Sequence, residues 1–457
     1  MKGFFGIFVN AWKVPELRKK LLMTLLLIII FRIGCFIAVP GLDRTALSQL
    51  AGSGLFNFMD VLSGGAMNNV SLFAMGISPY INASIIMQLL TIAIPALERW
   101  QKEEGEEGRK KINRITKYLA IGLGLFQAIM LFVNIYNKGQ GSSNFGLIVD
   151  GPFGWVLAFS LMVLTFTAGT AILMWLGDKI TEVGIGNGIS MIIFAGILAN
   201  GRNLAVSVYN FIRAIDPSTG TTSEVYSKIP LVGRIISIVI LGIIFLAVIV
   251  AVVWMDSGER RIPVQYAKRV VGRKVYGGQN THIPLKVNSA GVLPIIFAMS
   301  VLQFPITIVG MINASGKAYK GLSEFMNTWW YILIYAILII AFTFFYNMLY
   351  FDPVDIANNL KNNGGFVPGL RPGRATSDYI KNASRRITWF GAIFLAILAI
   401  FPSVVQKILV LFNEGFSGMS GLWIGGTSVL ILVGVAVETV RQLESQLLMR
   451  HYKGFLD

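Results

Sequence analysis

The chain has 457 residues, of which 54% are hydrophobic and 14% carry a charge, and its formal net charge is +16. Soluble proteins average about 25% charged residues, so this composition excludes an ordinary soluble globular protein and indicates a polytopic membrane protein. The single cysteine, Cys35, excludes a disulfide framework within the chain. Because the basic residues are not pooled in one soluble region, their placement is interpreted first as a signal of membrane topology.

Residues 1–20 combine basic side chains with aromatic and aliphatic ones, a pattern typical of an amphipathic helix at a membrane surface. Residues 21–39 are predicted to form the first span, and they are too long for the core of a cleavable signal peptide. Arg32 falls inside this span, where a charge costs about 3 kcal/mol on insertion scales. It is therefore expected to snorkel or to face protein, and the sequence does not indicate its partner.

Residues 55–62 (LFNFMDVL) are apolar, but they are too few to cross a bilayer, because a spanning helix needs about 20 residues. The run Ser63, Gly64, Gly65 interrupts them. Residues 72–93 are long enough to span, and they carry Pro79 inside. A half-helix followed by a glycine break predicts backbone that lines a cavity, since irregular backbone facing lipid would leave amide groups unpaired.

One face of residues 72–93 changes character along its length. Residues spaced three or four apart share this face, namely Ile77, Ile81, Ser84, Gln88 and Thr91. One end of the face is therefore predicted to be dry and the other wet. The alternative is ordinary helix packing, in which isoleucine is common and Ser, Gln and Thr bond to neighbouring helices, and this segment alone favours that alternative.

Further apolar stretches bring the predicted number of spans to ten. They lie at residues 118–135, 154–176, 185–198, 235–254, 292–312, 330–350, 389–404 and 422–440. Most Lys and Arg residues then fall on the side of the N-terminus, so the positive-inside rule predicts that both termini are cytoplasmic. The basic segments on that side are residues 1–20, 96–117, 256–290, 351–387 and the tail 441–457.

Five predicted spans precede a polar external segment at residues 200–234, and five follow it. An odd number in each part means that the two parts enter the membrane from opposite sides, as inverted repeats around a central pathway do. The sequence therefore predicts an N-terminal half (21–199) and a C-terminal half (235–440) that are related by pseudo-symmetry, with residues 200–234 as the hinge between them.

Enzyme chemistry is not evident. The two histidines, His282 and His451, lie in a basic loop and in the tail, so neither a metal site nor a Ser-His arrangement is predicted. No G-x-x-x-x-G-K-[ST] loop occurs, so any ATP must be used by a partner. The main alternative is a secondary transporter with inverted repeats, which needs acidic groups inside the membrane, whereas Asp178, Glu182 and Glu438 fall at the ends of spans. No cofactor is expected.

Two cytoplasmic loops, 256–290 and 351–387, are large and basic. Their simplest role is to hold the topology and to meet anionic lipid. The Pro-Gly turns around Arg371 indicate a shaped surface, which favours docking of a cytoplasmic partner that presents phosphate groups or an acidic face.

Three motifs of this chain resemble the SecY family, the channel subunits of protein-conducting translocons, and the bacterial form is the most similar. They are residues 71–84 (SLFAMGISPYINAS), residues 174–190 (MWLGDKITEVGIGNGIS) and the loop at 352–373. The resemblance extends from the basic N-terminus to the tail, but it does not cover the external segments 201–228 and 413–421.

The resemblance implies an hourglass pore that a plug at about 55–65 closes on its external side. The implied plug residues are Leu55, Phe56, Phe58, Met59, Asp60 and Val61. The implied constriction is a ring of isoleucines, namely Ile77, Ile81, Ile189, Ile193, Ile296 and Ile431. A signal sequence would enter at a lateral gate between the second and seventh spans, with Gln88, Ser300 and Gln303 as its polar lining. The loop tips would dock the SecA motor or a ribosome through Arg273, Lys274 and Arg371.

A ring of branched apolar side chains suits the passage of polypeptides, because a translocating chain presents every kind of side chain in turn and the ring can yield around each. The same ring resists water and ions by dewetting when it is narrow. Pro79, Pro294 and Pro305 are expected to remove backbone donors inside the two gate helices and so to ease their separation.

The sequence therefore predicts an all-α channel of the bacterial inner membrane that translocates secretory polypeptides and releases membrane segments laterally. SecE and SecG are the expected subunits, and SecA or a translating ribosome is expected to supply the driving force. Besides the secondary transporter, a second alternative is a membrane insertase or docking scaffold without a pore, which would have no use for a plug.

Overall fold

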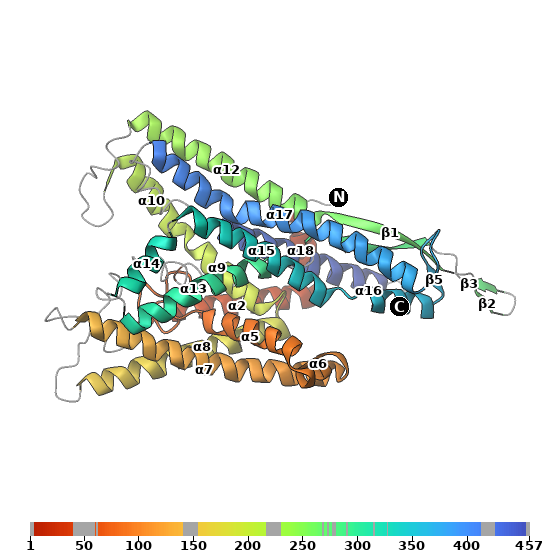
Figure 1. Ribbon diagram of the computed structural model, residues 1–457, viewed down its shortest axis with the longest axis horizontal. Coiled ribbons are helices and arrows are strands. Elements are labelled where there is room, and N and C mark those ends of the chain that lie inside the picture. The colour runs from red at the N-terminus through yellow and green to blue at the C-terminus, as the bar shows by residue number, and fades with distance from the viewer. Residues whose placement is uncertain are drawn as a thin grey trace. The chain divides into compact units, whose positions relative to one another are not determined.

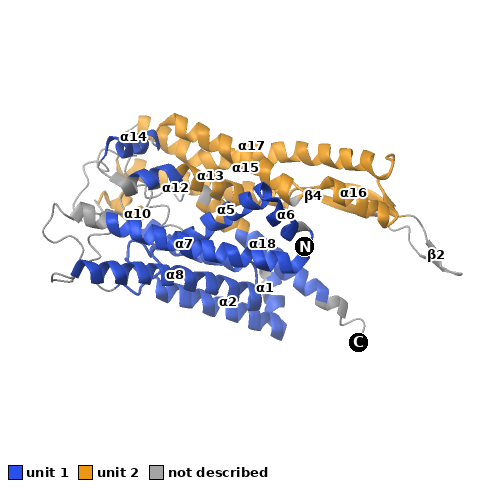
Figure 2. Ribbon diagram, turned by 60° about the horizontal axis from the view of Figure 1, so that its bottom comes forward, with its two compact units in different colours: residues 1–206, 303–326, 435–457 blue, residues 207–302, 327–434 orange. Residues whose placement is uncertain are grey.

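The structure, a computed structural model, is almost entirely helical, which confirms the predicted class of a helical membrane protein. It divides into two compact units (Figure 2), of which unit 1 comprises residues 1–206, 303–326 and 435–457, and unit 2 comprises residues 207–302 and 327–434. The residues that the structure describes are 4–39, 60, 63–139, 154–215, 230–266, 269–271, 274–276, 280–288, 291–313, 316–326, 328–412 and 426–453.

Unit 1 is built from the helices of the first part of the chain (Figure 1). They are α1 (Phe4–Lys13), α2 (Pro15–Gly34), α5 (Ser78–Ala93), α6 (Pro95–Lys102), α7 (Gly105–Gly139), α8 (Gly154–Val183) and α9 (Gly188–Ala199), together with the later α14 (Lys317–Met326). Helix α7 packs between α5 and α8, and α2 and α9 both contact α8. Helix α10 (Gly201–Arg213) follows α9 and passes from unit 1 into unit 2.

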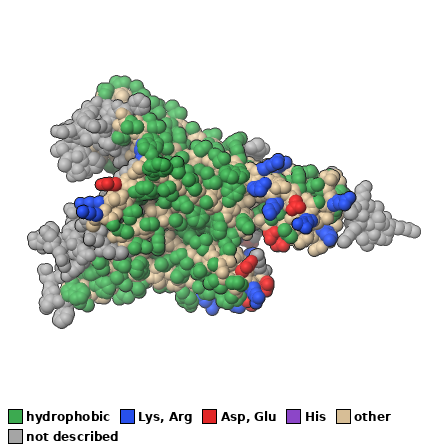
Figure 3. All heavy atoms as spheres, viewed as in Figure 1, with side chains coloured by type: hydrophobic (Ala, Val, Ile, Leu, Met, Phe, Trp, Pro, Cys, Tyr) green, Lys and Arg blue, Asp and Glu red, His purple; other side chains and the backbone are tan. Residues whose placement is uncertain are grey.

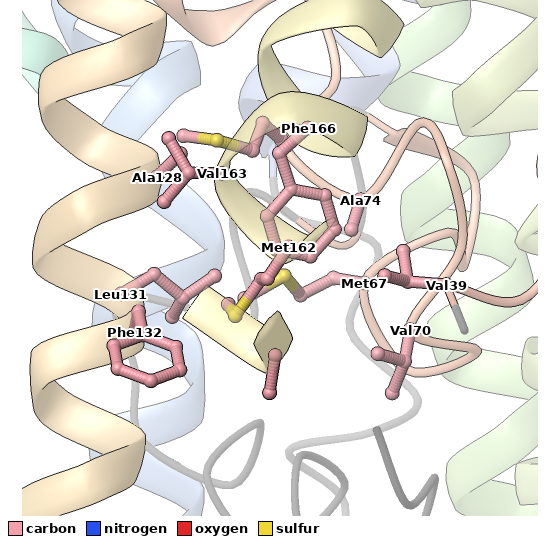
Figure 4. Close-up of a cluster of buried hydrophobic side chains, with 12 residues drawn as sticks. Val39, Met67, Val70, Ala74, Ala128, Leu131, Phe132, Met162, Val163 and Phe166 are labelled. Carbon is pink, nitrogen blue, oxygen red and sulfur yellow. The ribbon is translucent and has the colours of Figure 1, made fainter. Parts of the chain in front are cut away.

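The core of unit 1 joins helices to non-helical chain (Figure 4). Val39 and Met67, from the segment between α2 and α5, pack with Phe132 of α7 and with Met162 and Phe166 of α8. All five side chains are at least nine-tenths buried. In a bilayer the lipid tails are as apolar as these side chains, so the cluster stabilises unit 1 through close packing rather than through exclusion of water.

Unit 2 contains the long helices of the second part of the chain. They are α12 (Leu231–Ser257), α15 (Trp329–Tyr350), α16 (Pro353–Asn362) and α17 (Arg374–Phe412), together with the first parts of α13 (Leu293–Asn313) and α18 (Gly426–Lys453). Helices α15 and α17 lie side by side (Figure 1), and the rings of Phe344 and Trp389 meet edge to face at 4.9 Å. Aromatic contacts of this kind add about 0.5–1.5 kcal/mol beyond simple burial.

The expectation of an entirely helical chain is wrong for the basic loop at 256–290. Strand β1 (Glu259–Tyr266) pairs antiparallel with β4 (Asn280–Lys286) and, on its other edge, with β5 (Gly365–Phe366). Strands β2 (Arg269–Val271) and β3 (Lys274–Tyr276) form a separate hairpin. Strand β1 forms because buried and exposed residues alternate along it for a short stretch. Its buried residues, Ile262 and Val264, pack in one cluster with Leu360 of α16 and Ile380 of α17.

The structure confirms several long apolar helices, but not the predicted count of ten spans. Among the described residues, six helices are long and apolar enough to cross a membrane, or seven if α5 and α6, which meet at a bend of 105°, form one span. Four of the predicted spans continue well beyond their expected ends, in α7, α8, α17 and α18. Ten therefore stays a prediction.

Three predicted boundaries are wrong for local reasons. Helix α2 begins at Pro15 and ends at Gly34, five residues before the predicted end, because residues 37–39 pair with 70–72 instead. The span predicted at 72–93 begins as a helix only at Ser78, since Gly76 takes a positive φ of 55°. The span predicted at 185–198 is followed directly by α10, so the segment at 200–234 begins with helix, and its external position stays a prediction.

The expected role of the prolines is wrong for two of the three. Pro79 and Pro294 lie in the first turns of α5 and α13, where backbone N–H groups have no partner within the helix, so a proline there removes no hydrogen bond. Only Pro305 lies inside its helix. Any weakening of the proposed gate helices by proline is therefore confined to α13.

The turn between α8 and α9 yields a test of the packing in unit 1. A Cβ atom added at Gly188 would overlap the carbonyl oxygen of Gly177 and would lie 2.9 Å from Cβ of Ile180. We expect Gly188→Ala to destabilise the protein by about 1–3 kcal/mol through overpacking. The measurement is the temperature at which the detergent-solubilised protein loses its monodisperse chromatographic peak.

Gly122→Ala is the matched control, because a Cβ at Gly122 of α7 meets nothing within 4 Å. Alanine is the better helix former by about 1 kcal/mol, so this variant should keep or raise the transition temperature. Equal transition temperatures for the two variants would contradict the packing argument.

Candidate functional site

The non-helical chain between α2 and α5 is held in unit 1 by its own backbone. The amide of Val39 donates to the carbonyl of Val70 and the amide of Leu72 donates to that of Ile37, both at 2.9 Å, and Ala38 forms a β-bridge with Ser71. These bonds satisfy polar groups that lipid cannot satisfy. The irregular backbone is thus paired within the protein, and that it lines a cavity stays a prediction.

Asp60 organises the turn that follows the predicted plug half-helix. Its carboxylate accepts from the amide N–H of Asn68 at 2.9 Å and from the side-chain Nδ2 of Asn68 at 2.6 Å. Its backbone carbonyl accepts from the Ser63 hydroxyl at 3.2 Å and from the Gly65 amide at 2.9 Å.

Of the six predicted plug residues, the structure describes Asp60 alone. The other five lie outside the described residues: Leu55, Phe56, Phe58, Met59 and Val61. Ser63 is helical and the residues from Gly64 onward form turns, so the predicted glycine break is present at Gly64 and Gly65. Gly64 and Gly65 both take positive φ values, of 70° and 85°, which favour glycine.

The partner of Arg32, which the sequence did not indicate, is the glycine break. Arg32 Nη1 donates to the carbonyl oxygen of Gly64 at 2.8 Å, and its guanidinium carbon lies 5.5 Å from the centre of the Phe36 ring. Cys35, which follows the last turn of α2, directs its Sγ toward the carbonyl oxygen of Ser63 at 3.6 Å. The charge within the first predicted span therefore faces protein, as expected.

Close packing leaves room only for glycine along this segment. A Cβ at Gly64 would lie 2.5 Å from Arg32 Nη1 and 2.9 Å from Cα of Gly196 in α9. A Cβ at Gly169 of α8 would overlap the backbone oxygen of Leu72. The segment is thus enclosed by α2, α8 and α9 at backbone distance.

The predicted stripe on α5 differs in character between its two ends. Ile77 precedes the helix as its N-cap residue, and it and Ile81 are both buried. At the other end Gln88 Nε2 lies 3.4 Å from Ser84 Oγ, and the Thr91 hydroxyl donates to the carbonyl oxygen of Gln88 at 2.7 Å. The polar groups of the stripe therefore bond to one another along α5.

The isoleucines of the predicted ring lie on several helices of both units. Ile193 is buried and Ile189 half-buried on α9, where a Cβ at Gly177 of α8 would lie 3.1 Å from Ile189 Cγ1. Ile296 and Ile431 are buried on α13 and α18 in unit 2. Because its members are divided between the units, the ring stays a prediction.

The predicted gate residues are likewise divided. Gln88 lies on α5 of unit 1, while Ser300 and Gln303 lie three residues apart on α13, so the latter two share one side of that helix. Gln303 is buried and Ser300 is half-buried. The lateral gate also stays a prediction.

The basic loops present shaped turns at one end of unit 2. Arg371 is exposed between Gly369 and Gly373, whose positive φ values of 83° and 100° form the expected Pro-Gly turns, and its carbonyl accepts from the Thr376 hydroxyl at 2.9 Å. Lys274 opens strand β3, whereas Arg273 lies outside the described residues. Figure 3 shows Lys and Arg gathered over β1 and α16, beside a mostly hydrophobic helical surface.

The acidic residues at the helix ends form ion pairs. Lys117 of α7 pairs with Asp178 of α8 at 2.5 Å, and Lys179 pairs with Glu182 at 2.7 Å, which lowers the pKa of Glu182. No group of three or more His, Cys, Asp or Glu residues within the described ranges is placed to hold a metal ion. The paired acids favour a structural role over an ion relay.

Solved structures share this fold. A structure described as a protein-conducting channel matches with a TM-score of 0.60 and 20% identity, covering 94% of this chain and 92% of the other. A second, of a SecY protein described by a plug domain that stabilises the closed channel, matches with a TM-score of 0.61, 20% identity and the same coverage. At this identity the likeness establishes the fold.

Sequence comparisons establish the family. The family model described as SecY matches residues 71–440. A protein translocase subunit SecY from Halalkalibacterium halodurans is 44% identical over 99% of this chain and 100% of its own length. That from Bacillus subtilis is 41% identical over 99% of both chains, and that from Thermotoga maritima is 39% identical over 98% of this chain and 97% of its own. The chain belongs to the SecY family.

Proposed function

We propose that this chain is the channel-forming subunit of a bacterial protein translocase, which conducts unfolded secretory polypeptides across the membrane and releases membrane segments laterally. The observation that carries the proposal is the likeness, over nearly its whole length, to proteins described as protein translocase subunit SecY. The enclosed non-helical segment from Gly64 to Ile77 supports it, because such backbone is tolerated at membrane depth where it lines a cavity.

In this proposal two structural elements, one after the other along the pore, close it. Residues 55–62 form the plug, and the ring of six isoleucines forms the constriction. Ile77 and Ile81 lie beside the anchored segment that follows the plug, which supports a connection between the two elements. The ring has no hydrogen-bonding groups, so it can pass any side chain and still exclude ions by dewetting.

The lateral gate is proposed between α5 and α13. Gln88, Ser300 and Gln303 supply polar groups to a surface that otherwise faces apolar chain, and a signal sequence would separate the two helices there. Pro305 supports this role, because a proline inside α13 removes one backbone hydrogen bond and permits a bend.

The assembly follows from the loops and the charge. Both termini are placed in the cytoplasm and the chain in the bacterial inner membrane, with two inverted halves (21–199 and 235–440) and the segment 200–234 as their hinge. Arg273, Lys274 and Arg371 would dock SecA or a ribosome, and SecE and SecG would complete the channel. Solved channels seen with ribosomes, canine Sec61 and yeast Ssh1, support the ribosome as a partner, and anionic lipid would meet the remaining basic residues.

The secondary transporter is the weaker function. It requires acidic groups inside the membrane that are free to bind an ion, whereas Asp178 and Glu182, near the end of α8, are paired with Lys117 of α7 and with Lys179. We propose no catalytic arrangement among the residues that the structure describes, and the energy for transport would come from the docked partner.

The pathway of the polypeptide tests the proposed function. With Cys35 replaced by Ser, a single cysteine at Ile81 or Ile189 should form a disulfide with a cysteine in an arrested secretory chain in reconstituted membranes, because both residues belong to the proposed ring. The measurement is the adduct on a non-reducing gel. A cysteine at Leu164, whose side chain is 66% exposed on α8, is the matched control.

Adducts at positions 81 and 189 that the Leu164 control lacks are the expected result. If neither position reacts in membranes that translocate, the pathway lies elsewhere and the channel proposal fails.

The seal of the resting channel is a second test. Ile81→Gly and Ile189→Gly should raise the ion conductance of reconstituted membranes without substrate several-fold, because each removes a branched side chain from the dewetted constriction. Ile92→Gly makes the same change at an exposed position of α5 and should leave the conductance at the level of the unaltered protein. Equal conductance for all three variants would count against the ring.

A further inference from the structure

We propose that Thr24 of α2 is a positioning residue, which holds the turn at residues 184–187 and so fixes the first turn of α9, where Ile189 of the proposed ring lies. This inference rests on the proposed function, in which the isoleucine ring seals the resting channel. Thr24 is not among the residues predicted for the ring, the gate or the plug. In this arrangement one hydroxyl of the first span sets the position of a side chain that another span carries.

The first support is a hydrogen bond that joins two distant parts of the chain. The backbone amide of Ile185 donates to Thr24 Oγ1 at 3.0 Å, and the same hydroxyl donates to the carbonyl oxygen of Lys20 at 2.9 Å. Thr24 and Ile185 are both buried. A buried amide that has no acceptor is strongly unfavourable, so the turn is stable where Thr24 can reach it.

The second support is the close approach of the turn to α2 and α8. A Cβ atom at Gly184 would lie 2.5 Å from Thr24 Oγ1, and one at Gly188 would overlap the carbonyl oxygen of Gly177. The hydroxyl of Thr24 therefore reaches the amide of Ile185 because the residue before that amide is glycine. The turn is thus fixed at its beginning by α2 and at its end by α8.

The third support is the series of bonds that leads from this turn into α9. Thr181 Oγ1, near the end of α8, accepts from the amide of Gly188 at 2.9 Å. Asn187 is the N-cap residue of α9, and its Oδ1 accepts from the amide of Ile189 at 3.1 Å. Because Ile189 is the second residue of α9, a displacement of the turn displaces Ile189 with it.

The fourth support is apolar packing on the same turn. Ile185 packs in one buried cluster with Leu17 of α2 and Leu443 of α18. Gly186 takes a positive φ of 85°, and a Cβ atom there would lie 3.5 Å from Thr439 Oγ1, which is also on α18. Burial of apolar surface has no directional preference. The hydrogen bond to Thr24 therefore decides how the turn is oriented within this cluster.

The experiment compares Thr24→Val with the unaltered full-length protein, reconstituted together with its partner subunits. Valine has nearly the shape of threonine but cannot accept a bond from the Ile185 amide. Thr170→Val is the matched control, because Thr170 is buried on α8 and its hydroxyl donates to a carbonyl of its own helix, that of Phe166. Thr24 makes the corresponding bond within α2, so the comparison isolates the bond to Ile185.

Two measurements are made on each variant. Hydrogen exchange of the amides of residues 184–188, followed by mass spectrometry, depends on the turn and does not depend on transport. We expect Thr24→Val to speed this exchange by about tenfold, because a buried amide loses its acceptor. The resting ion conductance should rise several-fold, because Ile189 moves within the constriction. Thr24→Ser, which keeps the hydroxyl, and Thr170→Val should match the unaltered protein in both measurements.

A merely structural role for Thr24 would lower the thermal transition and leave the resting conductance unchanged. Exchange or conductance in Thr24→Val that is no higher than in Thr170→Val overturns the inference. A further rise when Thr24→Val is added to Ile189→Gly also overturns it, because a residue that acts through Ile189 has no effect once that side chain is absent. If Thr24→Val does not yield folded protein, Thr24→Ala is judged by the same criteria.

Ile81→Gly and Ile189→Gly separate this inference from the proposed function. If both variants conduct while Thr24→Val does not, the ring stands and the inference about Thr24 fails. If neither conducts, the ring itself fails, and the inference fails with it whatever the exchange shows.

Discussion

Every backbone amide and carbonyl at membrane depth needs a partner within the protein, and unit 1 is arranged around that constraint. Between Gly34 and Ser78 most of the described residues are not helical, so the usual intrahelical bonds are missing over part of this length. The chain meets the constraint by pairing residues 37–39 with 70–72, and by using side chains of Asp60 and Arg32 as acceptor and donor. The proposed plug depends on this arrangement, because it needs chain that is inside the membrane and yet not locked into a helix.

Small residues make the arrangement possible. Gly64, Gly169 and Gly196 let the non-helical segment approach α8 and α9 at backbone distance, where any Cβ at the first two would clash or crowd its neighbours. Van der Waals contact over such surfaces replaces the hydrophobic driving force that lipid cannot supply. The non-helical segment from Gly64 to Ile77 is thereby held by many weak contacts and few strong ones.

Much of the fold follows from local pattern. Hydropathy over about 20 residues predicts α12, α13 and α15 closely, and the short apolar run before Ser63-Gly64-Gly65 predicts the irregular segment. The start of α5 was missed because hydropathy counts apolar residues, and residues 72–77 are apolar turns. The strand β1 was missed although Ile262 and Val264 alternate with Arg261, Pro263 and Gln265, since the signal is brief and lies in a basic loop.

The partner of Arg32 could not come from periodicity, because Gly64 is 32 residues away and no repeat in the sequence relates the two. The Pro-Gly turns around Arg371 were predictable for the opposite reason, since turn chemistry is encoded within a few residues. The ring and the gate divide between two units, so their assembly depends on contacts that neither local pattern nor a single unit contains.

Helix α17 connects the loop at 352–373 to the interior of the membrane without interruption. Its 39 residues, from Arg374 to Phe412, extend over about 58 Å at 1.5 Å per residue, and its one proline, Pro402, comes in the last third. Between Arg374 and that proline the helix is a continuous rod, packed along α15. A partner that pushes on the loop beside Arg371 would therefore tilt α17 as one rigid body. No series of small side-chain rearrangements would be needed to transmit this movement along the helix.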